Sequence, residues 1–274
     1  MCYNSSIFSK EVTFMEAILE RMICATAWTM PPPAAYGPFH LIFTIVGFAV
    51  SFFLARRLRN LGDKGNRIVL LTCGLFLLVS EVYKQLFYYY FIGGRSYQWW
   101  IFPFQLCSVP MYLCIIAPLL KPGKLQKGMY NFMMIYNLLG GFMAFVEPSG
   151  IVHEYWTLTL HAFIWHMMLV FIGLYLALSN RAGKTMADYK AASITFVALC
   201  AIAFCINLLC WKPANGDINM FFVGHAKSSL IVFSWIAENL GWYVSTALYI
   251  PVVCLGAFLI FLPFHLHAKK KLAV

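Results

Sequence analysis

Charged residues are scarce in this chain of 274 amino acids: they make up 11% of it, against 62% hydrophobic residues, and the mean hydropathy is +0.75. Soluble domains carry roughly 25% charged residues, so this composition excludes an ordinary water-soluble fold. Acidic residues are the scarcer kind, with 10 Asp and Glu against 20 Lys and Arg, which gives a formal net charge of +10. The composition therefore indicates an integral membrane protein.

Several chemical signatures are also missing. The 9 cysteines include no CxxC pair, so neither a disulfide framework nor a thiolate metal site is indicated. Glycine-rich phosphate loops, zinc-protease helices and nucleophile-elbow serines are absent. We expect no metal and no cofactor. The N-terminus lacks the basic start, apolar core and cleavage site of a secretion signal, so we expect it to be retained.

Long apolar runs are what the sequence does have. A helix needs roughly 20 apolar residues to cross a bilayer, and no alternation typical of a membrane barrel is present. Seven runs reach helical length: 39–55, 68–92, 101–120, 128–146, 155–178, 191–211 and 242–264. The sequence predicts an all-α polytopic bundle of seven transmembrane helices. Its parts are an N-terminal interfacial segment (1–37), the seven-helix domain (38–268) and a basic cytoplasmic tail (269–274).

The basic residues predict the orientation, because Lys and Arg are retained on the cytoplasmic side. One set of connections holds 14 of the 20: Arg56, Arg57, Arg59, Lys64, Arg67, Lys121, Lys124, Lys127, Arg181, Lys184, Lys190, Lys269, Lys270 and Lys271. The opposite set holds Lys10, Arg21, Arg95, Lys212 and Lys227. We expect the N-terminus outside and the C-terminus inside. Orientation and anionic cytoplasmic lipid then account for the positive charge, which leaves no need for a nucleic-acid partner.

Two further helices are expected at the membrane surface. Between Glu11 and Trp28, apolar residues recur at helical spacing before the prolines at 31–33 stop the helix. This pattern predicts an amphipathic helix lying on the outer interface. The stretch 228–240 predicts a second interfacial or re-entrant helix.

Polar residues within the apolar runs indicate a functional site. Ionisable groups in hydrocarbon cost several kcal/mol unless they face a partner or a water-filled cavity. The rise of 1.5 Å per residue places most of them in the outer half of the bundle. We expect a shared polar cavity there, with these contributors: Glu81, Lys84, Gln105, Cys107, Asn137, His161, His166 and Asn207.

Each contributor also has a structural interpretation. Glu81 and Lys84, three residues apart, could form an ion pair that fixes helix packing. Cys107 could be a small apolar filler, and Asn137 could serve close helix packing beside two glycines. His161 and His166 point about 140° apart on one helix, so a single cavity cannot easily receive both.

Cys107 stands out because of its surroundings. If Pro103 opens the third span as a first-turn residue, Cys107 lies in the next turn, where amide dipoles favour a thiolate. A histidine of the fifth span at matching depth could accept its proton. His161 matches Cys107 in depth, whereas His166 requires an offset or tilted helix, and spacing alone does not choose between them.

The order of the motifs resembles a known family. These motifs are "FHLIF" in the first run, "SEVYKQLFYYY" in the second, "FPFQLCS" in the third, "LLGGFMAFVEP" in the fourth and "HAFIWHMMLVFIGLYL" in the fifth. From about residue 36 to 264 the chain resembles the YwaF-type family of bacterial integral membrane proteins. The resemblance implies a location in a bacterial cytoplasmic (inner) membrane.

A distantly related eukaryotic branch of that family is described as a phospholipid acyltransferase. The resemblance implies that Cys107 carries the acyl group and that His166, more naturally than His161, assists it. The bacterial pattern often has His or Gln two residues before the cysteine. Gln105 occupies that position here, which leaves a hydrogen-bond donor in place of a general base.

We therefore expect a lipid-modifying enzyme, an acyltransferase or acyl hydrolase, whose partners are membrane lipids including an acyl donor. Cys107 attacks the ester, His166 transfers protons, and Gln105 or Lys84 stabilises the oxyanion. The alternative is a non-catalytic binding protein or transporter for an amphipathic small molecule, whose recognition groups are the same polar residues. The hypothesis that the protein is a receptor is supported only by the number of predicted spans. The sequence does not predict an oligomeric state.

Overall fold

The computed structural model describes residues 14–226 and 228–272. Lys10, Glu11 and Lys227, which were used in the sequence analysis, lie outside these ranges. Within them the chain forms nine α-helices: α1 (Phe14–Cys24), α2 (Pro38–Leu58), α3 (Asp63–Phe87), α4 (Val109–Ile116), α5 (Lys124–Val146), α6 (Trp156–Leu178), α7 (Met186–Cys210), α8 (Ile231–Leu240) and α9 (Trp242–Leu272). The described residues contain no β-strand, so the prediction of an all-α fold is confirmed.

Six of these helices are long and apolar enough to cross a membrane: α2, α3, α5, α6, α7 and α9. They coincide with six of the seven predicted runs. A π-helical turn, Tyr88–Ile92, lengthens α3. The long apolar helices identify an integral membrane protein, as the composition predicts.

The third predicted run, 101–120, does not form a full-length helix. Only α4 and a 3₁₀ turn are helical there, and Val109–Leu119 spans about 16 Å of a roughly 30 Å hydrocarbon core. Prolines explain the break, because Pro103, Pro110 and Pro118 lack an N–H group and disfavour helix at the preceding residue. Pro110, and not Pro103, lies in the first turn of α4. Our prediction that Pro103 opens this helix is therefore wrong, and Cys107 precedes the helix.

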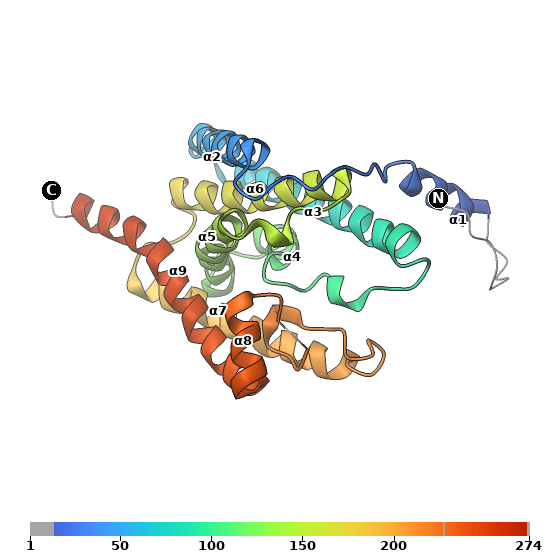
Figure 1. The fold of residues 1–274 in the computed structure, drawn as a ribbon. Coiled ribbons are helices and arrows are strands. Elements are labelled where there is room, and N and C mark those ends of the chain that lie inside the picture. Colours follow the sequence, from blue (N-terminus) through green and yellow to red (C-terminus); the bar gives the residue numbers. More distant parts are fainter. Residues whose placement is uncertain (1–13, 227, 273–274) are drawn as a thin grey trace.

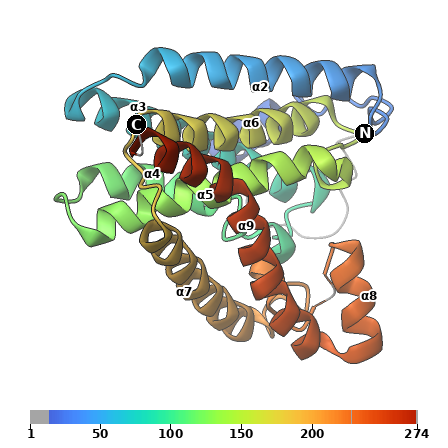
Figure 2. The same ribbon diagram turned by 90° about the vertical axis from the view of Figure 1, so that its left-hand side faces the viewer.

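The helices pack around α5, which contacts α6, α7 and α9. In turn α2 packs on α6, α3 packs on α4 and α6, and α8 packs on α9 (Figures 1 and 2). Gly141 of α5 lets α6 approach closely, because a Cβ atom there would lie 3.0 Å from the carbonyl oxygen of His166. Small residues at such crossings are typical of membrane helix bundles. The close approach fixes the height of His166 against α5.

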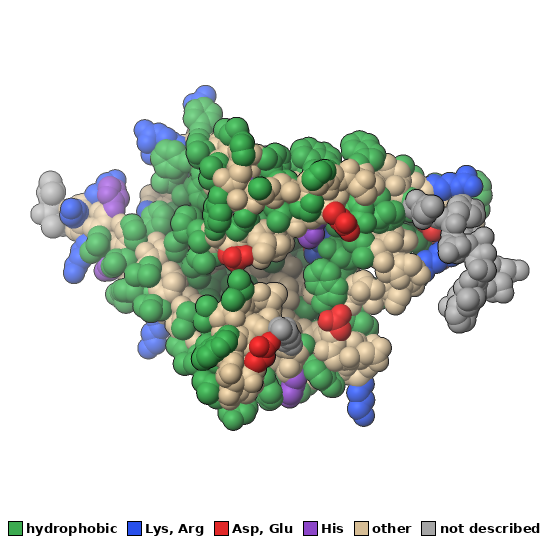
Figure 3. Space-filling view, viewed as in Figure 1, with side chains coloured by type: hydrophobic (Ala, Val, Ile, Leu, Met, Phe, Trp, Pro, Cys, Tyr) green, Lys and Arg blue, Asp and Glu red, His purple; other side chains and the backbone are tan. Residues whose placement is uncertain are grey.

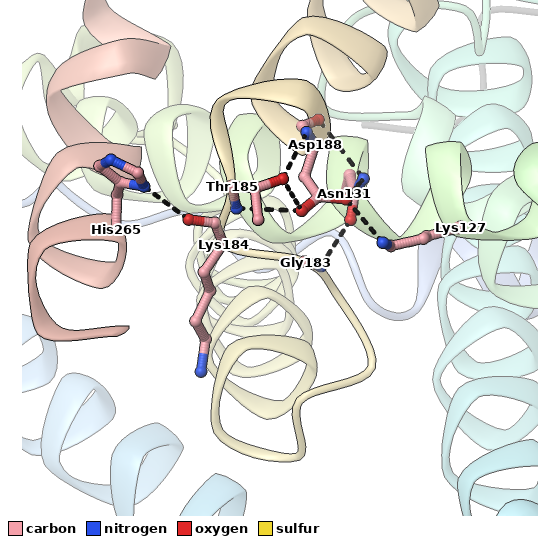
Figure 4. A network of polar contacts seen from close by, with 7 residues as sticks. All are labelled: Lys127, Asn131, Gly183, Lys184, Thr185, Asp188 and His265. Carbon is pink, nitrogen blue, oxygen red and sulfur yellow. Dashed lines mark hydrogen bonds and ion pairs between the residues drawn. The ribbon is translucent and has the colours of Figure 1, made fainter. Parts of the chain in front are cut away.

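A polar network joins several helix ends at one end of the bundle (Figure 4). Asp188, at the start of α7, binds Lys127 of α5 at 2.8 Å and accepts a hydrogen bond from Asn131. His265 of α9 donates from Nδ1 to the carbonyl oxygen of Lys184 at 2.7 Å. At the same end Arg181, after α6, pairs with Asp63 at the start of α3. We call this the basic end, because it carries the described members of the larger basic set.

The opposite end is held by the N-terminal segment. The hydroxyls of Thr26 and Tyr83 are 2.6 Å apart, and Arg95 forms an ion pair with Glu20 of α1. In its described part, α1 is the predicted N-terminal helix, with Phe14 80% exposed, and it ends at Cys24, before the prolines. The predicted helix in 228–240 appears as α8. The predicted boundary at 269 falls inside α9, which continues to Leu272.

The chain between α3 and α5 passes along the length of the bundle. Asn66, near the start of α3, donates to the hydroxyl of Tyr130, near the start of α5, at 3.2 Å, so both helices begin at the basic end. Because α3 ends at the opposite end, residues 93–123 return to the basic end. They do so through a non-helical stretch, 102–108, followed by α4. We call residues 102–108 the irregular segment.

Candidate functional site

The irregular segment is held in the bundle by side chains from several elements. Tyr112 of α4 donates to the carbonyl oxygen of Pro103 at 2.8 Å, and Trp165 of α6 donates to that of Cys107 at 2.9 Å. Just before the segment, Gln85 of α3 donates to the carbonyl oxygen of Ile101 at 2.8 Å. Non-helical backbone at membrane depth is tolerated where protein or a water-filled cavity surrounds it. These donors supply the hydrogen bonds that a regular helix would supply itself.

Gln105, within the irregular segment, also connects the segment to the rest of the bundle. Its Nε2 donates to the carbonyl oxygen of Asn219 at 3.0 Å, and its Oε1 accepts from the backbone N–H of Phe221 at 2.9 Å. Asn207 of α7 binds the same loop, residues 219–221. Its Nδ2 donates to the carbonyl oxygen of Met220 at 3.0 Å, and its Oδ1 accepts from the backbone N–H of Met220 at 2.7 Å. The structure thus brings Gln105 and Asn207 together on one loop, where they position backbone.

Glu81 and Lys84 form the predicted ion pair. Lys84 Nζ lies 2.9 Å from Glu81 Oε1, and the same oxygen accepts from Gln85 Nε2 at 2.7 Å. The other carboxylate oxygen, Oε2, is buried without a partner among the described residues. Lys84 Nζ lies 6.0 Å from the ring centroid of Trp165, which is a cation–π contact with α6.

The histidines of α6 lie near this ion pair. The ring of His161 is 5.4 Å from that of Trp165, and its buried Nε2 has no partner among the described residues. His166 donates from Nδ1 to the carbonyl oxygen of Ala162 at 2.7 Å. This bond fixes the tautomer and leaves Nε2 as the basic nitrogen. The charge of Lys84 acts on both histidines, so both belong to one neighbourhood despite their different directions.

Cys107 completes the neighbourhood. Its thiol lies within the electrostatic reach of Lys84 and Glu81. Cys107 and His166 are only half-buried although both sit inside the bundle, so each keeps some accessible surface. We call Glu81, Lys84, Cys107, His161, Trp165 and His166 the Lys84 cluster.

The molecular surface is hollowed near the middle of one face, and histidine and basic side chains are visible inside the hollow between hydrophobic ones (Figure 3). The charges of Lys84 and Glu81 also shift the pKa values of side chains in the surrounding loops. Burial and the nearby Lys84 lower the pKa of His153, which keeps this imidazole neutral at pH 7. Burial and the nearby Glu81 raise the pKa of Tyr97 to about 12. Both side chains therefore border the ion pair as neutral groups.

Asn137 is buried on α5, and its Nδ2 has no hydrogen-bond partner among the described residues. The structure places it one turn before Gly141, in the tightly packed contact with α6. No group of His, Cys, Asp and Glu within residues 14–226 and 228–272 could hold a metal ion.

The site residues predicted from the sequence did not include Trp165, Gln85 or Tyr97, although Gln85 was expected on the same helix face as Glu81 and Lys84. Trp165 follows His161 by one helical turn, so it faces the same side of α6, and this spacing could have identified it. Gln85 follows Glu81 by the same interval. Tyr97 lies in a loop that carries no periodic signal, and only the folded chain brings it near Glu81.

No curated protein and no solved structure matches the chain. A family model, that of the TMEM164 family, matches residues 35–262. This range is close to the 36–264 of the YwaF-type resemblance, but the YwaF name and the bacterial origin stay predictions. Because the matched range covers most of the chain and contains the whole Lys84 cluster, the protein belongs to the TMEM164 family of transmembrane proteins.

Proposed function

We propose that this protein is a lipid-modifying membrane enzyme, an acyltransferase or acyl hydrolase, that carries an acyl group on Cys107. One observation carries the proposal: Cys107 lies on an irregular segment inside the bundle, keeps accessible surface, and is within the electrostatic reach of the Glu81–Lys84 ion pair. A filler cysteine needs none of these features. The cysteine also occupies the position that the family resemblance assigns to the acyl carrier.

His166 serves as the base in this proposal. Its Nδ1 is engaged by Ala162, so Nε2 is free to accept the thiol proton. Lys84 serves as the oxyanion stabiliser, because its ammonium group lies in the same neighbourhood. Gln105, the other expected donor, has both amide atoms bound to the backbone of the 219–221 loop and therefore positions the segment.

The reaction has two steps. The Cys107 sulfur attacks the ester carbonyl carbon of a phospholipid while His166 Nε2 takes the thiol proton. The C–S bond forms, the C–O bond breaks, and the leaving oxygen takes the proton back, which releases a lysolipid. The hydroxyl of a second lysolipid, or water, then attacks the thioester and gives its proton to His166. The new C–O bond forms, the C–S bond breaks, and His166 returns its proton to the sulfur, so the thiol is regenerated without an oxidant.

In this proposal the chain crosses the membrane seven times. Six of the crossings are the long helices, and residues 93–123 make the remaining one through the irregular segment and α4. The basic end faces the cytoplasm, the N-terminus faces outside, and the Lys84 cluster opens to the outer leaflet. The family resemblance favours a bacterial cytoplasmic membrane.

Intact mass spectrometry tests the proposal. The purified protein is incubated with mixed phospholipids at neutral pH, alongside Cys107→Ala and the matched control Cys205→Ala, whose cysteine is exposed on α7. We expect a lipid-derived acyl adduct on the wild type and on Cys205→Ala, and none on Cys107→Ala. An equal adduct on all three, or no adduct on any, overturns the nucleophile assignment.

A second function, binding or transport of an amphipathic molecule, is favoured by one observation. Glu81 Oε2, Gln85 Oε1 and His161 Nε2 are buried without partners among the described residues, as expected where a ligand headgroup or water supplies them. Under this alternative, intact lipid co-purifies equally with wild type and Cys107→Ala, and no acyl adduct forms.

A further inference from the structure

An apolar groove runs along the outer surface between α2 and α6, with a volume of about 580 Å³. Its α2 wall extends from Phe39 to Leu54, which is about 22 Å at the helical rise. Its α6 wall includes Met167, Met168 and Phe171. No member of the Lys84 cluster lines the groove, including those on α6, which are His161, Trp165 and His166. The groove is therefore a feature separate from the proposed reaction site.

The groove faces hydrocarbon. Both helices are long enough to span the membrane, and α2 exposes Ile42 at 62% and Val46 at 54% on the groove side. Half of the roughly 30 Å hydrocarbon core is about 15 Å, so the groove can hold an acyl chain over the full depth of one leaflet. The surrounding solvent at this surface is itself acyl chains, which makes a lipid chain the natural occupant.

The groove leads to a cation at the basic end. Arg57 follows Val50, a groove residue, by seven residues, so it projects within about 20° of the same direction. Its side chain is exposed and has no ion pair among the described residues. Asp63, six residues further along the chain, is paired with Arg181. Arg56 projects about 120° away from Val50 and serves as an internal comparison.

We propose that this groove is a binding site for one anionic phospholipid of the leaflet at the basic end. One acyl chain lies between α2 and α6, and the headgroup phosphate binds Arg57, since Arg presents a planar fork that matches phosphate oxygens. At the far end of the groove Phe39 and Phe43 pack on Phe163, with ring centroids 5.3 and 5.0 Å apart. This aromatic wall limits how far the chain reaches.

A second copy of the chain fits this surface less well. A two-fold axis along the membrane normal brings the same patch of both copies together. The basic ends of two α2 helices, each with Arg56, Arg57 and Arg59, would then meet, and like charges repel. An anionic lipid headgroup removes that conflict, which favours lipid as the occupant.

Native mass spectrometry tests the site. The protein is reconstituted in nanodiscs with equal amounts of phosphatidylglycerol and phosphatidylcholine of the same acyl chains, and the lipid retained after release is identified. We expect the wild type to retain one phosphatidylglycerol in preference to phosphatidylcholine. Arg57→Ala should lower this retention about fivefold, because the headgroup phosphate loses its hydrogen-bonding partner, whereas Arg56→Ala should not.

A second pair of variants tests the groove itself. Val50→Trp fills the groove, and Ile45→Trp adds the same bulk on an exposed face outside it, since Ile45 is 69% exposed. We expect only Val50→Trp to lose the retained lipid. Equal retention of the two lipids by the wild type, equal behaviour of the paired variants, or a dimer that replaces the lipid overturns the proposal. Cys107→Ala should retain the lipid, which separates this result from the proposed reaction.

Discussion

The carbonyl oxygen of Ala162 decides which nitrogen of His166 is chemically useful. Because Nδ1 donates to it at 2.7 Å, the lone pair is on Nε2. His161 has no such tie on its Nε2, which is buried beside Trp165. Both histidines lie near Lys84, yet their hydrogen bonds suit them to different roles, one to proton transfer and one to ligand recognition.

Substitution of each histidine distinguishes these roles. We expect His166→Ala to slow acylation of Cys107 about 10²-fold or more, because the thiol loses its base. His161→Ala should keep the acylation rate at saturating lipid and raise the lipid concentration that is needed. Time-resolved intact mass spectrometry measures both values. Slow acylation in His161→Ala with normal acylation in His166→Ala would exchange the two roles.

Sequence spacing predicted one part of this site well. Glu81 and Lys84 are three residues apart on a helix, and helical geometry makes such residues neighbours, so their 2.9 Å contact is confirmed. The partners of Gln105 could not be predicted, because they lie 114 and 116 residues away in a loop without a periodic pattern. Residue spacing predicts contacts within one helix, but it does not predict contacts between residues that are far apart in the sequence.

The irregular segment is the element that differs most from expectation. Counting apolar residues identified six long helices correctly, because length and hydropathy decide whether a helix can span. The same count could not show that 102–108 leaves the helix, since a proline in a membrane run is tolerated when neighbouring side chains supply hydrogen bonds. Those neighbours, Tyr112 and Trp165, are identified as hydrogen-bond donors to the segment only in the folded chain.

Asn207 should stabilise the irregular segment through the 219–221 loop that it binds. Asn207→Leu removes two buried hydrogen bonds and leaves the backbone of Met220 unpaired, which we expect to cost about 2 kcal/mol of unfolding free energy. Release of the 219–221 loop also frees Gln105. Thermal unfolding in detergent and limited proteolysis of the loop measure the effect. Asn239→Leu on exposed α8 is the control, and equal stability of the two variants would contradict this prediction.

At the scale of the whole molecule, Asp188 joins α5 to the loop before α7. It binds Lys127, accepts from Asn131 and completes a capping box with Thr185 (Figure 4). We expect Asp188→Ala to lower the unfolding free energy by about 2 kcal/mol, because the cap and the pair are both lost. Thermal unfolding measures this change. Lys190→Ala, in the same helix and outside the network, should have a smaller effect; an equal loss would contradict the prediction.

The seven-passage topology has its own test. In a cysteine-light background, Ser96→Cys and Lys121→Cys flank the irregular segment and α4. If residues 93–123 cross the membrane, a membrane-impermeant thiol reagent added outside intact cells labels Ser96→Cys. The same reagent labels Lys121→Cys only after the membrane has been permeabilised. Labelling of both from one side would show that the segment is re-entrant and that the orientation must be revised.

The irregular segment also sets an order for biosynthesis. Trp165, which binds the carbonyl oxygen of Cys107, is translated 58 residues later, and Phe221, which binds Gln105, follows Gln105 by 116 residues. Until those residues arrive, the segment carries unpaired backbone groups that hydrocarbon does not accept. We therefore expect residues 102–108 to remain beside the insertion machinery, or in water, until α6 and the loop after α7 have been made. The part of the fold that carries the proposed nucleophile is then completed long after its own residues have been made.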